Sequence, residues 1–209
     1  KKRIIKNDLI KSNFDLKKFE KIILLASHAL SDANHFYQEF GSYSPFKDYY
    51  TQLTETLKFA QNNRQILFLV RPHPSSSFWN EEGLIKKILN SYSKYNIFLA
   101  DNKYATSDLL QISDTVITVC GTIGLEAAGY YGIKPILAGK SIYSNVGFCF
   151  NSTTKNQYFK NILYPKIKFN LNKKEFILAQ KALYYHQEIL NKDFKTVISM
   201  EDRLLSTHN

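Results

Sequence analysis

The stretch Asp114-Thr115-Val116-Ile117-Thr118-Val119-Cys120-Gly121-Thr122-Ile123-Gly124-Leu125-Glu126-Ala127-Ala128 decides the fold predicted for this chain. Its first part, Val116 to Val119, is an uncharged and mostly β-branched run, which is typical of a strand buried on both faces. The strand is expected to end at Gly121, where two glycines three residues apart permit a tight turn. Thr122 can then cap a helix that begins at about Ile123.

A strand followed by a short turn and a helix start is a natural anion site. The free N–H groups of the first helical turn carry partial positive charge, and they most often hold a phosphate. A strand-to-helix turn without any ligand is the alternative, because a short glycine motif alone is a weak signal. The wider pattern of the chain decides between the two.

Short apolar runs alternate with helical patterns between residues 21 and 138. Strands are predicted over 21–27, 65–70, 96–100, 115–119 and 135–138, and helices over 45–62, 81–92, 107–112 and 123–132, with Ser107 capping the third helix. This alternation predicts an α/β fold: a doubly wound, Rossmann-like, mostly parallel sheet of about five to six strands. Further helices are predicted over 157–163 and 173–190.

The chain is expected to divide into three parts. Residues 1–20 are a basic lead-in, residues 21–165 form the Rossmann-like domain, and residues 166–209 supply C-terminal helices that pack on it. A formal net charge of +10, spread along the chain, suits an anionic ligand, an acidic membrane surface or nucleic acid, and does not choose among them. No apolar run could cross a bilayer and the first residues lack a signal core, so a cytoplasmic protein is expected.

Two cysteines, Cys120 and Cys149, belong to no C-x-x-C pair, which argues against a disulfide scaffold or a structural zinc site. Cys120 stands where a nucleophile could, but a small buried thiol at a strand end is the more ordinary use. Paired tyrosines lie inside predicted helices, where they are expected to pack in the core. They therefore do not indicate nucleic-acid binding.

Each unusual cluster of the sequence follows a predicted strand. The clusters span residues 28–35, 71–77, 121–126 and 139–143. Ligands of a doubly wound sheet bind beyond the carboxyl ends of the strands, so these clusters are predicted to share one rim. Within Arg71-Pro72-His73-Pro74, the two prolines hold His73 with little freedom. Such an imidazole can bond a phosphate or a ribose hydroxyl, with Arg71 adding charge; the alternative is a strand terminator with a satisfied histidine.

Three motifs carry a resemblance to a known family. "RPHPSS" after a strand, "DTVITVCGTIGLEAAGYYGIKPILAG" and the later "Y…GF" resemble the donor-binding half of GT-B glycosyltransferases of bacterial capsule and surface-polysaccharide synthesis. "SHALSDANHFY" and "FKDYY" are similar to the group that contains the Kdo transferases. The resemblance covers about residues 21–160.

The resemblance implies that the chain binds a nucleotide-activated sugar, such as a CMP-linked acidic sugar, and transfers it to a glycan acceptor. It implies no metal cofactor, and a site at the inner face of the bacterial membrane. A GT-B enzyme has two such domains, so an N-terminal half or a partner chain is expected to supply the second. The donor-binding residues expected on this chain are Arg71, His73, Pro74, Ser75, Gly121, Thr122, Ile123, Gly124, Glu126 and Tyr143, with Glu126 for the ribose or the base.

The cluster His28, Asp32 and His35 has three interpretations. Asp32 could be a general base or nucleophile with His28 beside it, since both would face the second domain. The spacing would also put the three side chains on one helix face, where they could bind a metal. The third interpretation is an acid that caps a turn. Two alternative functions also stay open: a nucleotide-binding scaffold without turnover, and transfer of a polyol phosphate from a CDP-linked donor.

Overall fold

The computed structural model describes residues 15–31, 44–92 and 95–190, and these form an α/β fold around a parallel sheet. Its six strands lie in the order β3-β2-β1-β4-β5-β6, and every neighbouring pair is parallel. The predicted doubly wound, Rossmann-like class is therefore confirmed. The strands are β1 (Lys21–Ala26), β2 (Ile66–Arg71), β3 (Ile97–Leu99), β4 (Thr115–Thr118), β5 (Ile136–Leu137) and β6 (Phe150–Asn151).

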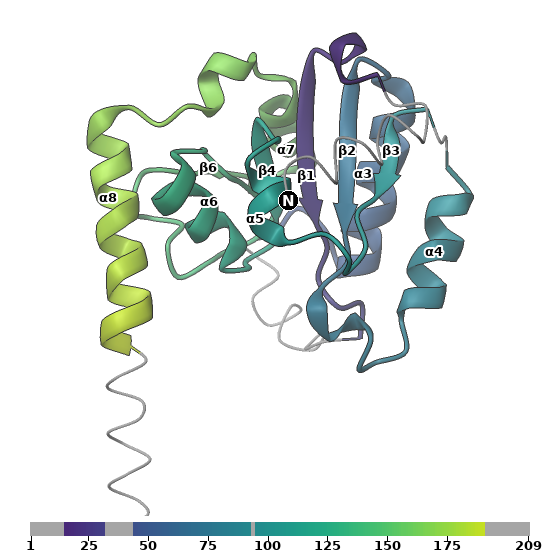
Figure 1. Cartoon of the computed structure of the whole chain (residues 1–209), viewed down its shortest axis with the longest axis horizontal. Helices are drawn as coiled ribbons and strands as arrows, with labels where there is room; N and C mark the ends of the chain where they lie inside the picture. Colours follow the sequence, from purple (N-terminus) through teal and green to yellow (C-terminus); the bar gives the residue numbers. More distant parts are fainter. Residues whose placement is uncertain (1–14, 32–43, 93–94, 191–209) are drawn as a thin grey trace, which may run out of the picture.

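Helices cover both faces of the sheet, which is why its central strands are continuous apolar runs (Figure 1). In β1, Ile23 and Leu25 pack toward α3, α4 and α7, whereas Leu24 packs toward α5 and α6. The helices are α3 (Tyr49–Asn62), α4 (Glu82–Asn90), α5 (Thr106–Leu110), α6 (Ile123–Tyr131), α7 (Lys155–Leu163) and α8 (Lys173–Tyr184). Short 3₁₀ turns are η1 (Leu16–Lys18), η3 (Pro74–Ser76) and η4 (Lys166–Phe169), and α8 runs into the π-helical turn η5 (Tyr185–Leu190).

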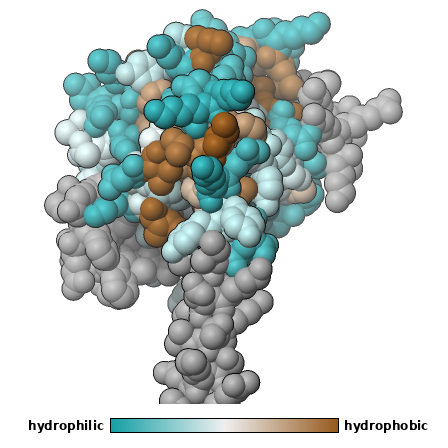
Figure 2. Space-filling view, turned by 90° about the vertical axis from the view of Figure 1, so that its left-hand side faces the viewer, coloured by the Kyte–Doolittle hydropathy of each residue, from teal (hydrophilic) through white to brown (hydrophobic). Residues whose placement is uncertain are grey.

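Helix α8 packs against the outside of α6, so the described part of the predicted C-terminal helices joins the same domain. Gly129 of α6 permits this approach, because a Cβ there would lie 2.7 Å from Leu183 Cδ2. Seen from the α8 side, apolar residues lie between polar ones on this outer surface (Figure 2). The end of the lead-in also joins the core, since Phe19 is buried.

Several predicted boundaries were wrong for local reasons. Helix α3 begins at Tyr49 rather than at residue 45, because the Asp48 carboxylate accepts a hydrogen bond from the Thr51 amide at 2.6 Å. Helix α5 begins at Thr106, so Ser107 does not cap it. Strand β6 is two residues long and lies outside the five strands that the sequence predicted.

The order of the strands fixes where a ligand can bind. The chain builds outward from β1 through β2 to β3, then returns to the other side of β1 with β4 and continues to β6. The crossover direction therefore reverses between β1 and β4, and the loops beyond their carboxyl ends diverge to leave a crevice. Within the described residues, no helix combines the length and the apolar character needed to cross a membrane.

Candidate functional site

A cavity of about 170 Å³ opens at the carboxyl ends of β1, β2 and β4, which is the point where the crossover direction reverses. Loops that are far apart in sequence meet in its wall, and three of the four predicted clusters, 28–35, 71–77 and 121–126, contribute residues to it. The cluster 139–143 does not line the cavity, so this part of the predicted shared rim was wrong. It is lined by Ala26, Ser27, His28, Arg71, Pro72, His73, Pro74, Thr106, Thr118, Gly121, Thr122, Ile123 and Glu126. Eight of the predicted site residues are in this wall; Ser75, Gly124 and Tyr143 lie behind it.

The start of α6 forms one side of the cavity. Among the described residues, the backbone amides of Thr122 and Ile123 donate to no acceptor, whereas the Gly121 amide donates to Thr118 Oγ1 at 3.1 Å. Helix α6 is nine residues long, so its first turn carries appreciable partial positive charge. Two amides and a helix start thus face the cavity and can bind an anion.

Thr122 occupies the N-cap position of α6, but the prediction that its side chain caps the helix was wrong. Its backbone is already helical (φ −62°, ψ −18°), and no side-chain cap bond forms. The hydroxyl instead donates to Glu126 Oε1 at 3.4 Å, one turn later. Thr122 and Glu126 therefore present a hydroxyl and a carboxylate side by side, and the carboxylate can accept hydrogen bonds from sugar hydroxyls.

The two glycines of the turn are needed because a side chain would not fit at either position. The unusual backbone angles for which the sequence suggested glycine do not occur there. Positive φ occurs at Gly132 and Gly147 among the described glycines, and at neither Gly121 nor Gly124. A Cβ on Gly121 would lie 2.9 Å from Thr118 Oγ1. A Cβ on Gly124 would collide with the Tyr143 hydroxyl and lie 3.3 Å from Pro135 Cβ.

Tyr143 supports the turn from beneath and does not line the cavity. Its side chain is 2% exposed, and its hydroxyl donates to the Gly121 carbonyl at 2.5 Å. Burial raises the pKa of Tyr143 far above its usual range, so the hydroxyl stays protonated and remains a donor. The predicted donor-binding role of Tyr143 can therefore only be indirect, through the position of Gly121.

His73 projects into the cavity with its tautomer set by Ser75. The Ser75 amide donates to His73 Nδ1 at 3.2 Å, and the Ser75 hydroxyl lies 2.6 Å from the same nitrogen. A nitrogen that accepts from an amide carries no proton, so the proton of the neutral ring is on Nε2. Ser75 is thus a positioning residue that leaves Nε2–H of His73 as a donor.

Arg71 ends β2, and its guanidinium bridges to the neighbouring strand. Its Nη1 donates to the carbonyls of Ala100, at 3.3 Å, and of Asp101, just after β3. Burial lowers the pKa of Arg71, and the Asp101 carboxylate opposes this change, so the charge is retained at neutral pH. These contacts fix the guanidinium in the cavity wall as a source of positive potential.

His28 lies in a row of stacked rings that the sequence did not indicate. Its ring stacks on Tyr49, with centroids 4.6 Å apart, and on His73, at 5.8 Å. Its Nε2 lies 3.7 Å from Cys120 Sγ. The predicted residue His28 is therefore beside His73 in the cavity wall, and the partly buried Cys120 thiol is a neighbour of the imidazole.

Glu81 is a further residue that sequence reasoning missed. Its buried carboxylate accepts hydrogen bonds from the amides of Leu30, at 2.8 Å, and Ser31, at 2.6 Å. It therefore anchors the loop after β1, which carries His28, to the start of α4. No signal in the sequence identified it, because an acid at a helix start usually only faces solvent.

Asp32 and His35 lie outside the described residues, so the catalytic and metal-binding interpretations of that cluster stay predictions. Within the described ranges, no group of three or more His, Cys, Asp or Glu side chains could hold a metal ion. Two other cavities differ in character. One of about 240 Å³ adjoins Pro72 and Asp101, and one of about 420 Å³, lined mainly by apolar side chains, lies between α6 and α8.

The fold is that of an α/β protein with a crevice at its switch point, and the wall of that crevice includes Arg71, His73 and the start of α6. Comparison of the chain with models of protein families gives no match. Comparison with curated proteins gives no match either.

Proposed function

We propose that this chain is the donor-binding half of a glycosyltransferase that uses a nucleotide-activated sugar in capsule or surface-polysaccharide synthesis. The favoured donor is a CMP-linked acidic sugar such as Kdo. The observation that carries the proposal is the convergence of His73 Nε2–H, the amides of Thr122 and Ile123, and the charge of Arg71 on one cavity. These groups come from the end of β2, the loop that follows it and the start of α6, as the resemblance to GT-B enzymes implies.

The chemistry of the cavity suits a phosphate with a sugar attached. Neutral and cationic donors on one side would stabilise the negative charge that develops on a nucleotide leaving group. Glu126, at the other end of the first turn of α6, can accept hydrogen bonds from ribose hydroxyls. Each polar side chain at the start of α6 thus has a role in binding the donor, and none of these roles needs a metal ion.

The size of the cavity supports the view that it is half of a site. Pockets that enclose a small ligand usually measure about 300–1,000 Å³. The volume here, about 170 Å³, holds a phosphate and part of its substituents and leaves the rest uncovered. A second domain or a partner chain would cover the remainder and present the glycan acceptor. We propose that such a half assembles at the inner face of the membrane.

Calorimetric titration with CMP, CDP and UDP tests the proposal. We expect CMP or CDP to bind, and His73→Ala to weaken that binding at least tenfold, since a hydrogen bond to a charged group contributes about 1.5–3 kcal/mol. His186→Ala is the matched control, because His186 lines the cavity beside α8 and should leave nucleotide affinity unchanged. Turnover with the second half restored then separates a transferase from a scaffold.

Two results would contradict the proposal. The site is wrong if His73→Ala binds the tightest nucleotide as well as the unmodified chain does. The function is wrong if none of the three nucleotides binds at millimolar concentration.

A further inference from the structure

Residues 127–174 carry an unusual excess of positive charge. They contain eight lysines and neither an aspartate nor a glutamate, in a chain whose formal net charge is +10. Within them, the segment from the end of α7 into η4, residues 160–168, exposes lysines and aliphatic side chains together. Its exposed residues include Lys160, Lys166 and Lys168, with Leu163 at 51% and Ile167 at 72%. Such a mixture of exposed basic and apolar groups is typical of an interaction surface.

The 160–168 segment is held in place by the fold on both sides of its aliphatic residues. Lys21 Nζ donates to the carbonyls of Ile162, at 2.5 Å, and Tyr164, at 2.7 Å. At the other end of the segment, the side chain of Phe169 is fully buried in the core. The two aliphatic side chains lie between these anchored points, so they are exposed on a backbone that the protein fixes.

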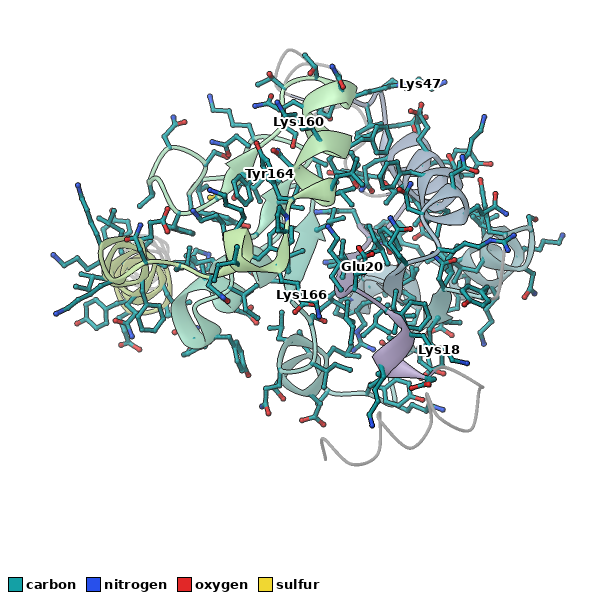
Figure 3. All side chains as sticks on the ribbon, turned by 90° about the horizontal axis from the view of Figure 1, so that it is seen from above. Lys18, Glu20, Lys47, Lys160, Tyr164 and Lys166 are labelled. Carbon is teal, nitrogen blue, oxygen red and sulfur yellow. The ribbon has the colours of Figure 1, made fainter. Side chains whose placement is uncertain are left out.

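The positive charge of this surface is only partly neutralised. Lys166 pairs with Asp114 at 3.2 Å. Among the residues that the structure describes, no carboxylate forms an ion pair with Lys160 or Lys168. Figure 3 looks onto this side of the molecule and shows Lys160 and Lys166 on it, with Glu20 on the same side. The surface therefore keeps a net positive charge beside its aliphatic side chains.

An anionic membrane surface fits this combination better than a nucleic acid, a glycan or a protein. Each lysine close to a leaflet of anionic lipid strengthens binding about fivefold, and aliphatic side chains enter the boundary between headgroups and acyl chains. A phosphodiester or sugar chain has no apolar layer that would accept Leu163 and Ile167. Lysine is also depleted at protein–protein interfaces, which argues against a protein partner.

The position of the segment keeps the donor cavity away from the lipid. Lys21, which holds the segment, is the first residue of β1, and Asp114, which pairs with Lys166, directly precedes β4. The segment is therefore at the amino-terminal edge of the sheet, whereas the cavity opens at the carboxyl ends of β1, β2 and β4. A chain that rests on lipid through residues 160–168 leaves the cavity open to nucleotides in solution.

We propose that the 160–168 segment docks this chain on a membrane surface that contains anionic lipid. Lys160 and Lys168 contact the lipid phosphates, and Leu163 and Ile167 enter the headgroup boundary. This inference rests on the part of the proposed function that places the protein at a membrane. It deepens that part by naming the surface and the charge of the lipid, and it makes no use of the nucleotide site.

Flotation of the whole chain with lipid vesicles tests the inference. We expect the chain to float with phosphatidylcholine vesicles that contain about 30% phosphatidylglycerol, and not with pure phosphatidylcholine, at about 0.1 M salt. Lys160→Gln combined with Lys168→Gln should lower the partition coefficient about twentyfold, because two cationic contacts are lost. Ile167→Ala should lower it about fivefold, because less apolar surface enters the lipid.

Helix α4 supplies matched controls, because it packs beside β3, away from α7 and η4. Lys86→Gln combined with Lys87→Gln removes the same charge from two exposed lysines. Leu84→Ala truncates an aliphatic side chain that is 46% exposed. Neither control should change the partition coefficient. All of these substitutions are at exposed side chains, so thermal unfolding should be the same in every variant to within a few degrees.

The outcomes separate this inference from the proposed donor site. The docking surface is overturned if the chain does not float with the anionic vesicles, if it floats equally with both kinds, or if either test variant floats as well as its control. It is also overturned if the chain binds heparin or DNA through the same lysines and does not float. CMP affinity should be unchanged in all variants, because none of the substituted residues lines the donor cavity. Loss of CMP binding in the unmodified chain would remove the donor site and leave the docking surface standing.

Discussion

The two edges of the sheet use polar residues in opposite ways. At the amino-terminal edge, seen in Figure 3, polar side chains serve the fold itself: Lys21 Nζ donates to the carbonyls of Ile162, at 2.5 Å, and Tyr164, at 2.7 Å. Asp114 accepts from the Ile22 amide at 2.7 Å and pairs with Lys166 at 3.2 Å. These side chains satisfy backbone groups at the end of α7 and tie together the starts of β1 and β4.

At the carboxyl-terminal edge, the internal hydrogen bonds hold side chains and amides in place and leave other donors of the same segments available to a ligand. Ser75 binds one nitrogen of His73 and leaves the other as a donor, and Thr118 takes the Gly121 amide and leaves the next two amides to the cavity. A polar residue in an α/β domain therefore indicates a ligand site only when its contacts within the protein leave a hydrogen-bonding group without a partner and pointing into a cavity. Substitutions of internally bonded side chains at the first edge should therefore change stability alone, and substitutions at the second should change binding.

The largest effect is expected at Asn96, just before β3. Its buried amide donates to the carbonyls of Ala60, Asn63 and Ile66, at 2.8, 3.2 and 2.8 Å. Asn96→Ala would leave these carbonyls without that donor, so we expect unfolding in urea to show a loss of about 3 kcal/mol. CMP affinity, measured by calorimetry where the variant is folded, should not change.

The exposed Asn102 gives the control for that experiment. Its amide reaches Glu82 Oε1 at only 3.4 Å, so Asn102→Ala should alter stability by less than about 0.5 kcal/mol. A weakened CMP affinity in Asn96→Ala would contradict the division between the two edges.

Gly124→Ala should have the next largest effect, and it should change both properties. The new Cβ would collide with the Tyr143 hydroxyl, which holds the Gly121 carbonyl, and overpacking of this kind costs about 2 kcal/mol. We expect that loss in thermal or urea unfolding, together with at least tenfold weaker CMP binding, because the turn that presents the amides is displaced.

Gly83→Ala is the matched glycine substitution, because a Cβ there meets nothing within 4 Å. It lies inside α4, where alanine should add about 0.5–1 kcal/mol of stability without changing nucleotide affinity. Unchanged CMP binding in Gly124→Ala would show that the α6 start does not contact the nucleotide.

The sequence predicted the sheet because its signal is local. Continuous apolar runs such as those of β1 and β2 have one physical explanation, which is burial on both faces. Strand β6 gave no such signal, since two residues are too few to show a pattern. The shared rim was also predictable, because parallel strands place all their carboxyl ends at one edge.

The parts of the site that the sequence did not predict depend on contacts between distant segments. The stack of Tyr49 on His28, and the bonds from Leu30 and Ser31 to Glu81, join residues that are 21, 51 and 50 positions apart. Tyr143 was placed in the right neighbourhood, but its burial beneath Gly121 could not be known without the packing of the 141–148 loop. The predicted role of the two glycines was wrong for the same reason, because the space around a residue is set by segments that are distant in the sequence.

The smallest effect is expected at the amino-terminal edge, in the pair formed by Lys134 and Glu175. Burial raises the pKa of Glu175, but the Lys134 ammonium at 2.5 Å and the Asn172 amide outweigh it, so the pKa in the folded state is lowered. A carboxylate with a lowered pKa stabilises the fold above its unfolded pKa, about 4.3, and loses that contribution as the pH falls through the folded value. Glu175→Gln, which can keep the capping box with Asn172, should therefore cost about 1 kcal/mol at pH 7.

The pH dependence distinguishes this pair from an exposed one. Between pH 7 and 5 the difference in unfolding free energy between Glu175→Gln and the unmodified chain should be constant, and it should shrink toward zero as the pH falls below about 4.3, because the unmodified side chain becomes neutral too. Glu55 pairs with Lys155 at 2.6 Å, but with exposed fractions of 33% and 49%, so Glu55→Gln should change stability by less than about 0.5 kcal/mol at any of these pH values. If the difference in unfolding free energy between Glu175→Gln and the unmodified chain stayed constant to pH 2, the shape of the side chain, and not the charge of the pair, would account for the stabilisation. CMP affinity should be the same in both variants, because neither carboxylate lies near the cavity at the opposite edge.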